Sequence, residues 1–120
     1  MNIETNKKLV NDFFKLLSLK DFQSLVSLFS NDATVIEPFS KEGKIMGKEG
    51  LSEFFKIMSI ASDGLNHSFS FEEVLPENIS IISEYQRGNK ITARFDFNFR
   101  NDNDGTNISN KITELKIMFL

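Results

Sequence analysis

The sequence predicts an α+β fold, with helices in the first half of the chain and a mostly antiparallel sheet in the second. Amphipathic helical patterns occupy the first 60 residues, and from residue 66 onward the apolar residues follow a period of two. A helix brings every third or fourth residue to one face, whereas a strand alternates its faces, so this change of period separates the two classes. Because no linker, repeat or low-complexity stretch interrupts the 120 residues, we expect residues 1–120 to form one domain.

Three segments carry apolar residues at the i, i+3, i+4, i+7 spacing of an amphipathic helix. The first helix is expected over residues 4–18. The second begins near Asp21, whose side chain is suited to capping a helix N-terminus, and the third includes residues 51–58. The apolar faces are formed by Val10, Phe13, Phe14 and Leu17, by Phe22, Leu25, Val26 and Phe29, and by Leu51, Phe54, Phe55 and Met58.

β-Branched and alternating segments predict the strands. The first β-branched run stops at Pro38, which cannot donate a ladder hydrogen bond. Residues 87–89 are expected to form a hairpin turn, and residues 101–110 a polar loop. Within residues 91–100, the odd-numbered residues are apolar and the even-numbered ones polar. The expected strands are residues 33–37, 42–47, 66–74, 79–86, 91–100 and 111–119.

Composition argues against several classes of protein. The net charge is −3, from 14 Lys and Arg against 17 Asp and Glu, and the lysines are scattered, so a nucleic-acid-binding module is not expected. No apolar run approaches the length of about 18 residues that a membrane span needs. Residues 1–6 lack the charged and apolar regions of a signal peptide. We therefore expect a cytoplasmic protein with no membrane or nucleic-acid partner.

The residue types also argue against a metal or redox centre. The chain contains no cysteine and one histidine, which excludes disulfides, thiolate ligands and two-histidine metal motifs within the chain. Residues 102–105 look like a calcium loop, but with Gly105 at the sixth position the first and twelfth ligands would be Arg100 and Lys111. We expect no metal site and no cofactor, and interpret these residues as a solvated hairpin loop.

A longer pattern extends over residues 5–60. An Asn-Asp-Ala-Thr-Val segment leads into a strand stopped by proline, and spaced glycines and a Phe-Phe pair follow. This pattern resembles the SnoaL-like and ketosteroid-isomerase-like proteins of the nuclear transport factor 2-like superfamily. The resemblance implies a cystatin-like cone, with three N-terminal helices on a curved sheet around an apolar pocket, and often a homodimer. The matching positions are residues 25–39, Gly43, Gly47, residues 49–51, Phe54 and Phe55, with residues 13–14 and 20–22 upstream.

Glu37 is the main candidate catalytic residue. The resemblance implies a proton-shuttling carboxylate directly before the proline of the first strand, and Glu37 holds that position. Glu37 also shares a strand face with Ala33 and Val35, so desolvation at an apolar pocket mouth would raise its pKa and suit it to act as a general base. An ordinary exposed glutamate at a strand end is the alternative interpretation.

The other groups of a ketosteroid isomerase are not matched. That resemblance requires an oxyanion hole made from a tyrosine and a protonated aspartic acid. The tyrosine position falls on Phe13, and the aspartate position falls near Phe95 or Asp96. If the Phe95 face points inward, the pocket lacks both proton donors, and we do not expect steroid-isomerase activity. The only tyrosine, Tyr85, lies where no family motif places a catalyst.

Two further polar sets are weaker candidates. Arg94 and Asp96 share one strand face, and with Glu114 on the next strand they resemble the Asp-Arg-Asp set of limonene-epoxide hydrolases. That function requires the polar face of residues 91–100 to line the pocket; a solvated or dimer-facing surface is the alternative. His67 shares an expected face with Phe69, Phe71 and Glu73 and is a candidate base with a pKa near neutrality, or else a histidine hydrogen-bonded at the rim.

Thirteen phenylalanines, against one tyrosine and no tryptophan, indicate an apolar pocket or an aromatic dimer surface in addition to a core. Our first hypothesis is a binding protein or vestigial enzyme that holds a small apolar ligand. The alternatives are a cofactor-independent isomerase or lyase with Glu37 as general base, an epoxide-hydrolase-like enzyme, and a homodimeric adaptor that binds proteins through its sheet. The candidate ligand-binding residues are Phe13, Leu17, Val35, Phe39, Phe54, Phe95 and Phe97.

Overall fold

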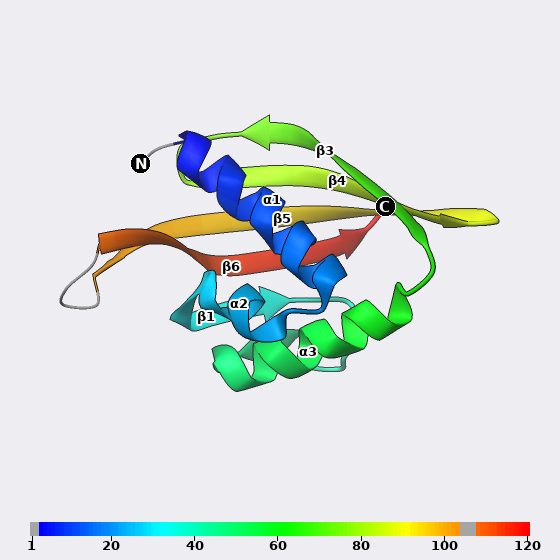
Figure 1. Cartoon of the computed structure of the whole chain (residues 1–120), viewed down its shortest axis with the longest axis horizontal. Coiled ribbons are helices and arrows are strands. Elements are labelled where there is room, and N and C mark those ends of the chain that lie inside the picture. The colour runs from blue at the N-terminus through cyan, green and yellow to red at the C-terminus, as the bar shows by residue number, and fades with distance from the viewer. Residues whose placement is uncertain (1–2, 104–107) are drawn as a thin grey trace.

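A computed structural model describes residues 3–103 and 108–120, in which three helices lie on one face of a curved, six-stranded sheet (Figure 1). The expected α+β class is therefore confirmed. The helices are α1 (Ile3–Leu19), α2 (Phe22–Ser27) and α3 (Gly47–Ala61). The strands are β1 (Phe29–Ile36), β2 (Lys44–Met46), β3 (Asn66–Val74), β4 (Asn78–Arg87), β5 (Asn89–Asn103) and β6 (Ile108–Phe119). In this part of the chain, no helix is long and apolar enough to cross a membrane.

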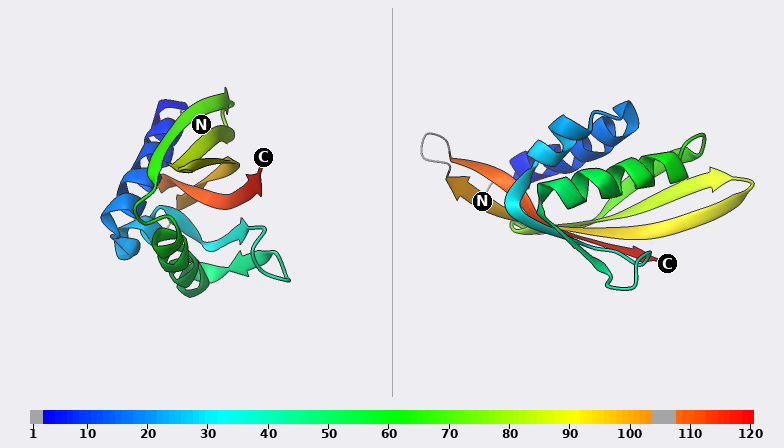
Figure 2. Two further views of the ribbon diagram at one scale, coloured as in Figure 1. Left: turned by 90° about the vertical axis from the view of Figure 1, so that its right-hand side faces the viewer. Right: turned by 90° about the horizontal axis from the view of Figure 1, so that it is seen from below.

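The sheet has the strand order β2-β1-β6-β5-β4-β3 and does not close. Among the described strands, β1 and β6 form the one parallel pair, and the other neighbours are antiparallel. The two turned views show the sheet curving around the helices, which cover its concave face (Figure 2). The apolar residues of β5 that the alternation identified, including Ala93, Phe95 and Phe97, are buried on this concave face. The even-numbered residues consequently lie on the convex face.

Three element boundaries differ from the sequence-based expectation. Phe29 continues the apolar spacing of the second helix, but α2 ends at Ser27 and Phe29 begins β1. The ring of Phe29 is fully buried. Because one apolar residue fits the buried face of either a helix or a strand, its position in the sequence does not distinguish the two. The partner strand is shorter than residues 42–47, because α3 begins directly after β2 at Gly47, whose φ of +80° allows the turn without a loop.

The polar loop expected over residues 101–110 is also shorter than predicted. The β5–β6 ladder continues through the pairs Asn101–Asn110 and Asp102–Ser109. Polar residues on both faces give no alternation signal where the hairpin extends beyond the core, although the backbone pairing persists. Residues 104–107, which contain part of the calcium-loop-like sequence, lie outside the described residues.

A β-bulge changes the faces of β3. The register with β4 shifts between Phe71 and Glu73, so Glu73 lies opposite Ser80 and Val74 lies opposite Ile79. Val74 consequently packs against the core, whereas Glu73 is exposed. The expectation that Glu73 shares the Phe71 face is therefore wrong, because a bulge inserts one residue and inverts the alternation beyond it.

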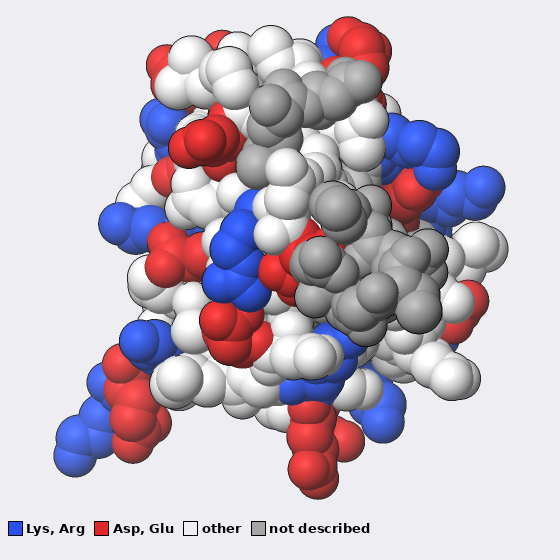
Figure 3. Space-filling model, turned by 90° about the vertical axis from the view of Figure 1, so that its left-hand side faces the viewer, with Lys and Arg blue, Asp and Glu red and all other residues white. Residues whose placement is uncertain are grey.

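Exposed ion pairs connect β1 to the β5–β6 hairpin. Arg100 in β5 donates to Asp32 Oδ1 at 2.7 Å and to Asp102 Oδ1 at 2.9 Å. The hydrogen bond from Arg100 lowers the pKa of Asp32 to about 2. Figure 3 shows the end of the molecule that carries this hairpin, where acidic and basic side chains are interspersed. Their mixture gives the visible described surface no large patch of one sign.

Phe13 occupies the centre of the core. Its ring is fully buried, and the nearest aromatic centroids lie 5.0–6.4 Å away, mostly in edge-to-face orientation. These rings come from two helices and two strands, so Phe13 joins both layers of the fold. They belong to Phe14, Phe29, Phe55, Phe95 and Phe97.

We expect Phe13→Ala to lower the free energy of unfolding by about 3–5 kcal/mol, because the truncation leaves a cavity among rings that cannot all move inward. Phe13→Tyr should cost about 1–3 kcal/mol, because it buries a hydroxyl among apolar neighbours. Urea denaturation measures both values. Phe119→Ala, at a side chain that is 53% exposed, is the control with a smaller loss. Equal losses in Phe13→Ala and Phe119→Ala would contradict the central role of Phe13.

Candidate functional site

Three hollows surround the C-terminal half of α3. We name them the polar hollow, of about 190 Å³, the inner apolar hollow, of about 150 Å³, and the outer apolar groove, of about 410 Å³. The polar hollow lies between the ends of α1 and α3 and the strands β3 and β4. The inner apolar hollow lies between α3 and the concave faces of β4, β5 and β6. The outer apolar groove lies between α3 and the β1–β2 connection.

The three hollows share walls, so they lie next to one another in a series. Ser62, Leu65 and Tyr85 line both the polar hollow and the inner apolar hollow. Phe39, Met58 and Ala61 line both the inner apolar hollow and the outer apolar groove. The inner apolar hollow is therefore the middle member of the series.

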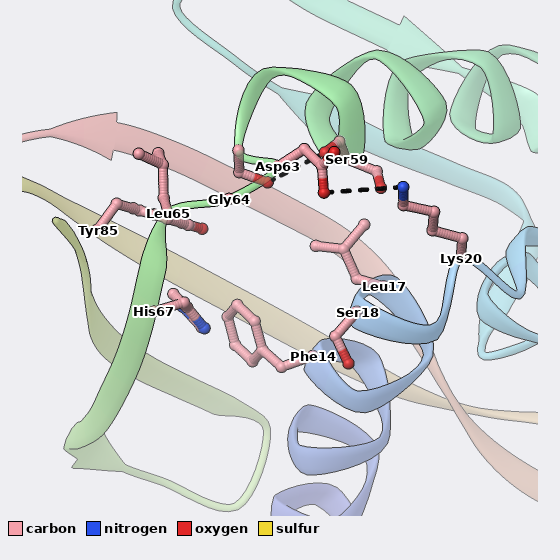
Figure 4. Close-up of a pocket in the computed structure, with 11 residues that line it drawn as sticks. Phe14, Leu17, Ser18, Lys20, Ser59, Asp63, Gly64, Leu65, His67 and Tyr85 are labelled. Atoms are coloured by element: carbon pink, nitrogen blue, oxygen red, sulfur yellow. Dashed lines mark hydrogen bonds and ion pairs between the residues drawn. The ribbon is translucent and has the colours of Figure 1, made fainter. Parts of the chain in front are cut away.

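The polar hollow brings together residues from four elements (Figure 4). Phe14 and Leu17 from α1 form its apolar side, and His67 and Tyr85 come from β3 and β4. Lys20, which follows α1 with a φ of +59°, lies with its Nζ 3.8 Å from Asp63 Oδ1. This exposed pair connects the end of α1 to the segment that follows α3.

Ser83 links His67 to Tyr85. The antiparallel register places His67 opposite Tyr85, with 4.6 Å between ring centroids, and His67 Nε2 lies 2.5 Å from Ser83 Oγ. Burial lowers the pKa of His67, so its imidazole is neutral at neutral pH. Burial raises the pKa of Tyr85, and the hydrogen bond with Ser83 opposes that rise only in part, so the phenol keeps its proton. The cluster is thus uncharged and rich in hydrogen-bonding groups.

Sequence reasoning missed Tyr85 and Ser83. The sequence does contain a signal for them. Every second residue of this strand lies on one face, and that face holds Ile79, Ile81, Ser83 and Tyr85. Polar residues on an otherwise apolar face indicate a candidate site. What the sequence could not supply was the β3–β4 register, which brings His67 to that pair.

Glu37 is buried, at 4% exposure, and both of its carboxylate oxygens bond to the loop that follows β1. The backbone N–H groups of Phe39 and Ser40 donate to Oε2 at 2.6 and 3.1 Å, and the Ser40 hydroxyl donates to Oε1 at 2.5 Å. Burial raises the pKa of Glu37, but these three hydrogen bonds outweigh it and the net pKa is lowered. The expected rise in pKa is therefore wrong. Catalysis by Glu37 stays a prediction.

The loop held by Glu37 carries Phe39 to the wall between two hollows. The Phe39 ring lies 6.2 Å from Phe54 and 5.3 Å from Phe119, between centroids, and lines both the inner apolar hollow and the outer apolar groove. Since its own backbone N–H donates to Glu37, the position of the ring depends on that carboxylate. The structure therefore gives Glu37 a positioning role.

The predicted ligand-binding residues separate into two groups. Leu17 lines the polar hollow, Phe95 the inner apolar hollow, Phe54 the outer apolar groove, and Phe39 both apolar spaces. The other predicted residues are fully buried in the core and line none of these three spaces. They are Phe13, Val35 and Phe97.

Arg94, Asp96 and Glu114 lie on the convex face of the sheet, away from the three hollows. Arg94 Nε donates to Asp96 Oδ1 at 3.1 Å, and Nη1 donates to Glu72 at 2.9 Å. Glu114 accepts a hydrogen bond from Asn98 at 3.3 Å. The epoxide-hydrolase-like arrangement requires this face to line the pocket, but the apolar Phe95 face lines the inner apolar hollow. The structure therefore favours the alternative, a surface outside the hollows, and catalysis by Arg94 and Asp96 stays a prediction.

Comparison with known proteins identifies the fold. No protein-family model and no curated protein matches the sequence. A ketosteroid isomerase-like protein from Erwinia carotovora atroseptica SCRI1043 matches with a TM-score of 0.78 at 11% identity, over 98% of this chain and 95% of that one. An NTF2-like protein of unknown function from Cytophaga hutchinsonii ATCC 33406 matches with a TM-score of 0.63 at 18% identity, over 96% of this chain and 89% of that one. An epoxide hydrolase/cyclase-like enzyme of pyran ring formation in the polyether salinomycin matches with a TM-score of 0.68 at 14% identity, over 97% of this chain and 91% of that one.

Stability should depend on pH through Glu37. The folded-state pKa of Glu37 lies below the ordinary value of 4.5. Ionised Glu37 therefore contributes to the free energy of unfolding above pH 4.5, and this contribution is lost as the pH falls through the folded-state pKa. We expect Glu37→Gln to lower the free energy of unfolding by about 1–3 kcal/mol at neutral pH, and by less at about pH 3. Urea denaturation at both pH values measures the difference. Glu53→Gln, at an exposed side chain of the same groove, is the control, and a pH-independent loss in Glu37→Gln would contradict the assignment.

Proposed function

We propose that this chain, which has the nuclear transport factor 2-like fold, binds a small apolar molecule in the inner apolar hollow. The observation that carries the proposal is the lining of this hollow. Its walls are formed by apolar side chains of α3, β5 and β6, including Met58, Phe95 and Ile117, while Tyr85 and Ser62 supply polar atoms at one side. A concave apolar site with a few polar groups is typical of small-molecule binding sites.

Steroid isomerisation is not the function that these residues favour. Phe13 carries no hydroxyl group. Of the two candidates for the aspartate position, Phe95 is apolar, and Asp96 bonds to Ser80 and Arg94 on the convex face, so neither oxyanion donor is matched at the hollows. An isomerase or lyase that uses Glu37 as its base remains the alternative proposal, and it would require the carboxylate to leave the backbone of Phe39 and Ser40. The ligand-binding proposal needs no such rearrangement.

We also propose that a second copy of the chain packs on the convex face of the sheet. Ile82 and Met118 flank Arg94 there in the strand register, and the ion pairs with Asp96 and Glu72 place both signs of charge beside them. A two-fold contact brings a surface patch against itself, so a patch with both charges is self-complementary. The same face is the one that a protein adaptor of this fold would use.

Filling the inner apolar hollow should abolish binding there. Ala93 is 2% exposed and lines the hollow, so the larger side chain of Ala93→Leu would occupy its volume. We expect the affinity for N-phenyl-1-naphthylamine, a neutral apolar fluorescent probe, to fall at least about tenfold. Thr92→Leu, which introduces the same side chain at the neighbouring position on the convex face, is the control.

Overpacking by Ala93→Leu could also destabilise the fold, so thermal unfolding of each variant accompanies the titration. Ile91→Trp enlarges an exposed residue of the same hollow and gives an independent test. Unchanged probe affinity in folded Ala93→Leu and Ile91→Trp would overturn the proposed site.

A dimer should have twice the 13.7 kDa mass of the chain in size-exclusion chromatography with light scattering. We expect Ile82→Lys to produce a monomer, because it places a second positive charge beside Arg94 at the centre of the contact. Ile60→Glu, at an exposed side chain of α3, should leave the dimer intact. A monomer mass for the unsubstituted protein at high concentration would refute the dimer.

A further inference from the structure

The volumes of the hollows limit the shape of a ligand. Binding sites for drug-sized molecules measure about 300–1,000 Å³. The inner apolar hollow, at about 150 Å³, lies below this range, whereas the adjoining outer apolar groove has about 410 Å³. Phe13 and Phe97 fill the space deeper in the cone, because both rings are fully buried. A ligand larger than the inner apolar hollow, N-phenyl-1-naphthylamine included, must therefore extend from it into an adjoining one. A narrow chain does so more readily than a compact cage of the same carbon number.

The polarity of the series changes from one end to the other. The polar hollow contains Lys20, Asp63, His67 and Tyr85, whereas the inner apolar hollow contains no charged residue. In the outer apolar groove, the lining includes Ile45, Phe54, Ile57 and Met58. Its two carboxylates already have partners, since Glu37 bonds to its own loop and Glu53 lies 3.5 Å from Lys56 Nζ. The series thus has one polar end and a long apolar remainder.

The hydrogen-bonding cluster at the polar end leaves a donor for a ligand. A neutral imidazole has one N–H donor and one acceptor nitrogen. If His67 Nε2 donates to Ser83, Ser83 can donate to Tyr85, and the Tyr85 hydroxyl hydrogen has no partner within the cluster. In the reverse direction Tyr85 donates to Ser83, Ser83 donates to Nε2, and the free donor is His67 Nδ1–H. Both donors belong to residues that line the polar hollow, so each arrangement favours a ligand with an acceptor oxygen.

We propose that the ligand is an elongated amphipathic molecule, an acyl chain ending in a carboxyl or ester carbonyl, that spans the three hollows. Its carbonyl oxygen accepts a hydrogen bond from Tyr85 or His67 in the polar hollow. The chain then runs through the inner apolar hollow and past Phe39 and Ala61 into the outer apolar groove. This inference rests on the proposed function, because it requires that the inner apolar hollow bind a ligand.

Chain length is the first test. Octanoic, dodecanoic and hexadecanoic acids, each below its micelle concentration, are titrated against protein loaded with N-phenyl-1-naphthylamine. We expect affinity to rise at least about tenfold from octanoic to hexadecanoic acid, because each added methylene is buried in the groove. Undecanoic acid should bind at least about tenfold more tightly than 1-adamantanecarboxylic acid, which has the same number of carbons in a compact cage. No gain with chain length, or equal binding of undecanoic and 1-adamantanecarboxylic acids, would overturn the proposal.

Substitution at the shared wall is the second test. Ala61 is exposed and lines both apolar spaces, so Ala61→Phe should obstruct the passage with little effect on folding. We expect hexadecanoic acid to lose about tenfold in affinity and octanoic acid to change by less than about twofold. Ile60→Phe, which places the same ring one residue earlier and outside the three linings, is the control. Equal losses for both acids in Ala61→Phe would count against a chain that passes this point.

The head group is tested separately. Tyr85→Phe combined with His67→Phe removes both donors, and should weaken all three acids by a similar factor of about ten. Comparing dodecanoic acid with its methyl ester then distinguishes the two sources of the carbonyl. If the acid binds more tightly than the ester, and Lys20→Met abolishes this difference, the ligand is a free acid. If the acid and the ester bind equally, the ligand is an ester. Full affinity in the double variant would overturn the placement of the head group. Binding of the fluorescent probe without binding of any acyl chain would leave the proposed function standing and refute this inference alone.

Discussion

The packing of Phe13 against five other phenylalanine rings determines where this fold can hold free space. These rings come from α1, α3, β1 and β5, so a single cluster fixes both helices against the concave face of the sheet. In a cone-shaped fold the deepest part is then solid, because close-packed aromatic rings leave no volume for a ligand. The three hollows of the candidate site therefore lie outside this cluster, around the C-terminal half of α3.

Glu37 supplies the second constraint on these hollows. A buried carboxylate is costly unless it is hydrogen-bonded, and Glu37 meets this requirement with two backbone N–H groups and one hydroxyl of the segment that follows it. The three hydrogen bonds that keep the carboxylate ionised therefore also fix the loop and the ring of Phe39. In the structure, Glu37 therefore holds part of the wall between two apolar spaces, and its role as a base stays a prediction.

The elements and the buried face of β5 could be predicted from the sequence because periodicity reports which residues meet the core. The site depended on contacts that periodicity does not encode. His67, Ser83 and Tyr85 meet only through the β3–β4 register. Asn6 is buried in α1 and forms hydrogen bonds with Pro76 and Asn110, which lie 70 and 104 positions further along the sequence. The direction of the Glu37 pKa shift depended on three local hydrogen bonds, since desolvation alone has the opposite sign.

The position of the hydrogen-bond donor distinguishes this chain from the chemistry that its sequence pattern first suggests. A hydroxyl at Phe13 would lie among five phenylalanine rings, which offer no hydrogen-bond partner to compensate for its desolvation. Tyr85, by contrast, lies at the boundary between the polar hollow and the inner apolar hollow, with Ser83 and His67 beside it. A donor at Tyr85 places the polar end of the proposed site beside the polar hollow and away from the aromatic cluster around Phe13. The proposed ligand then extends along α3, because the space around Phe13 is filled by aromatic rings.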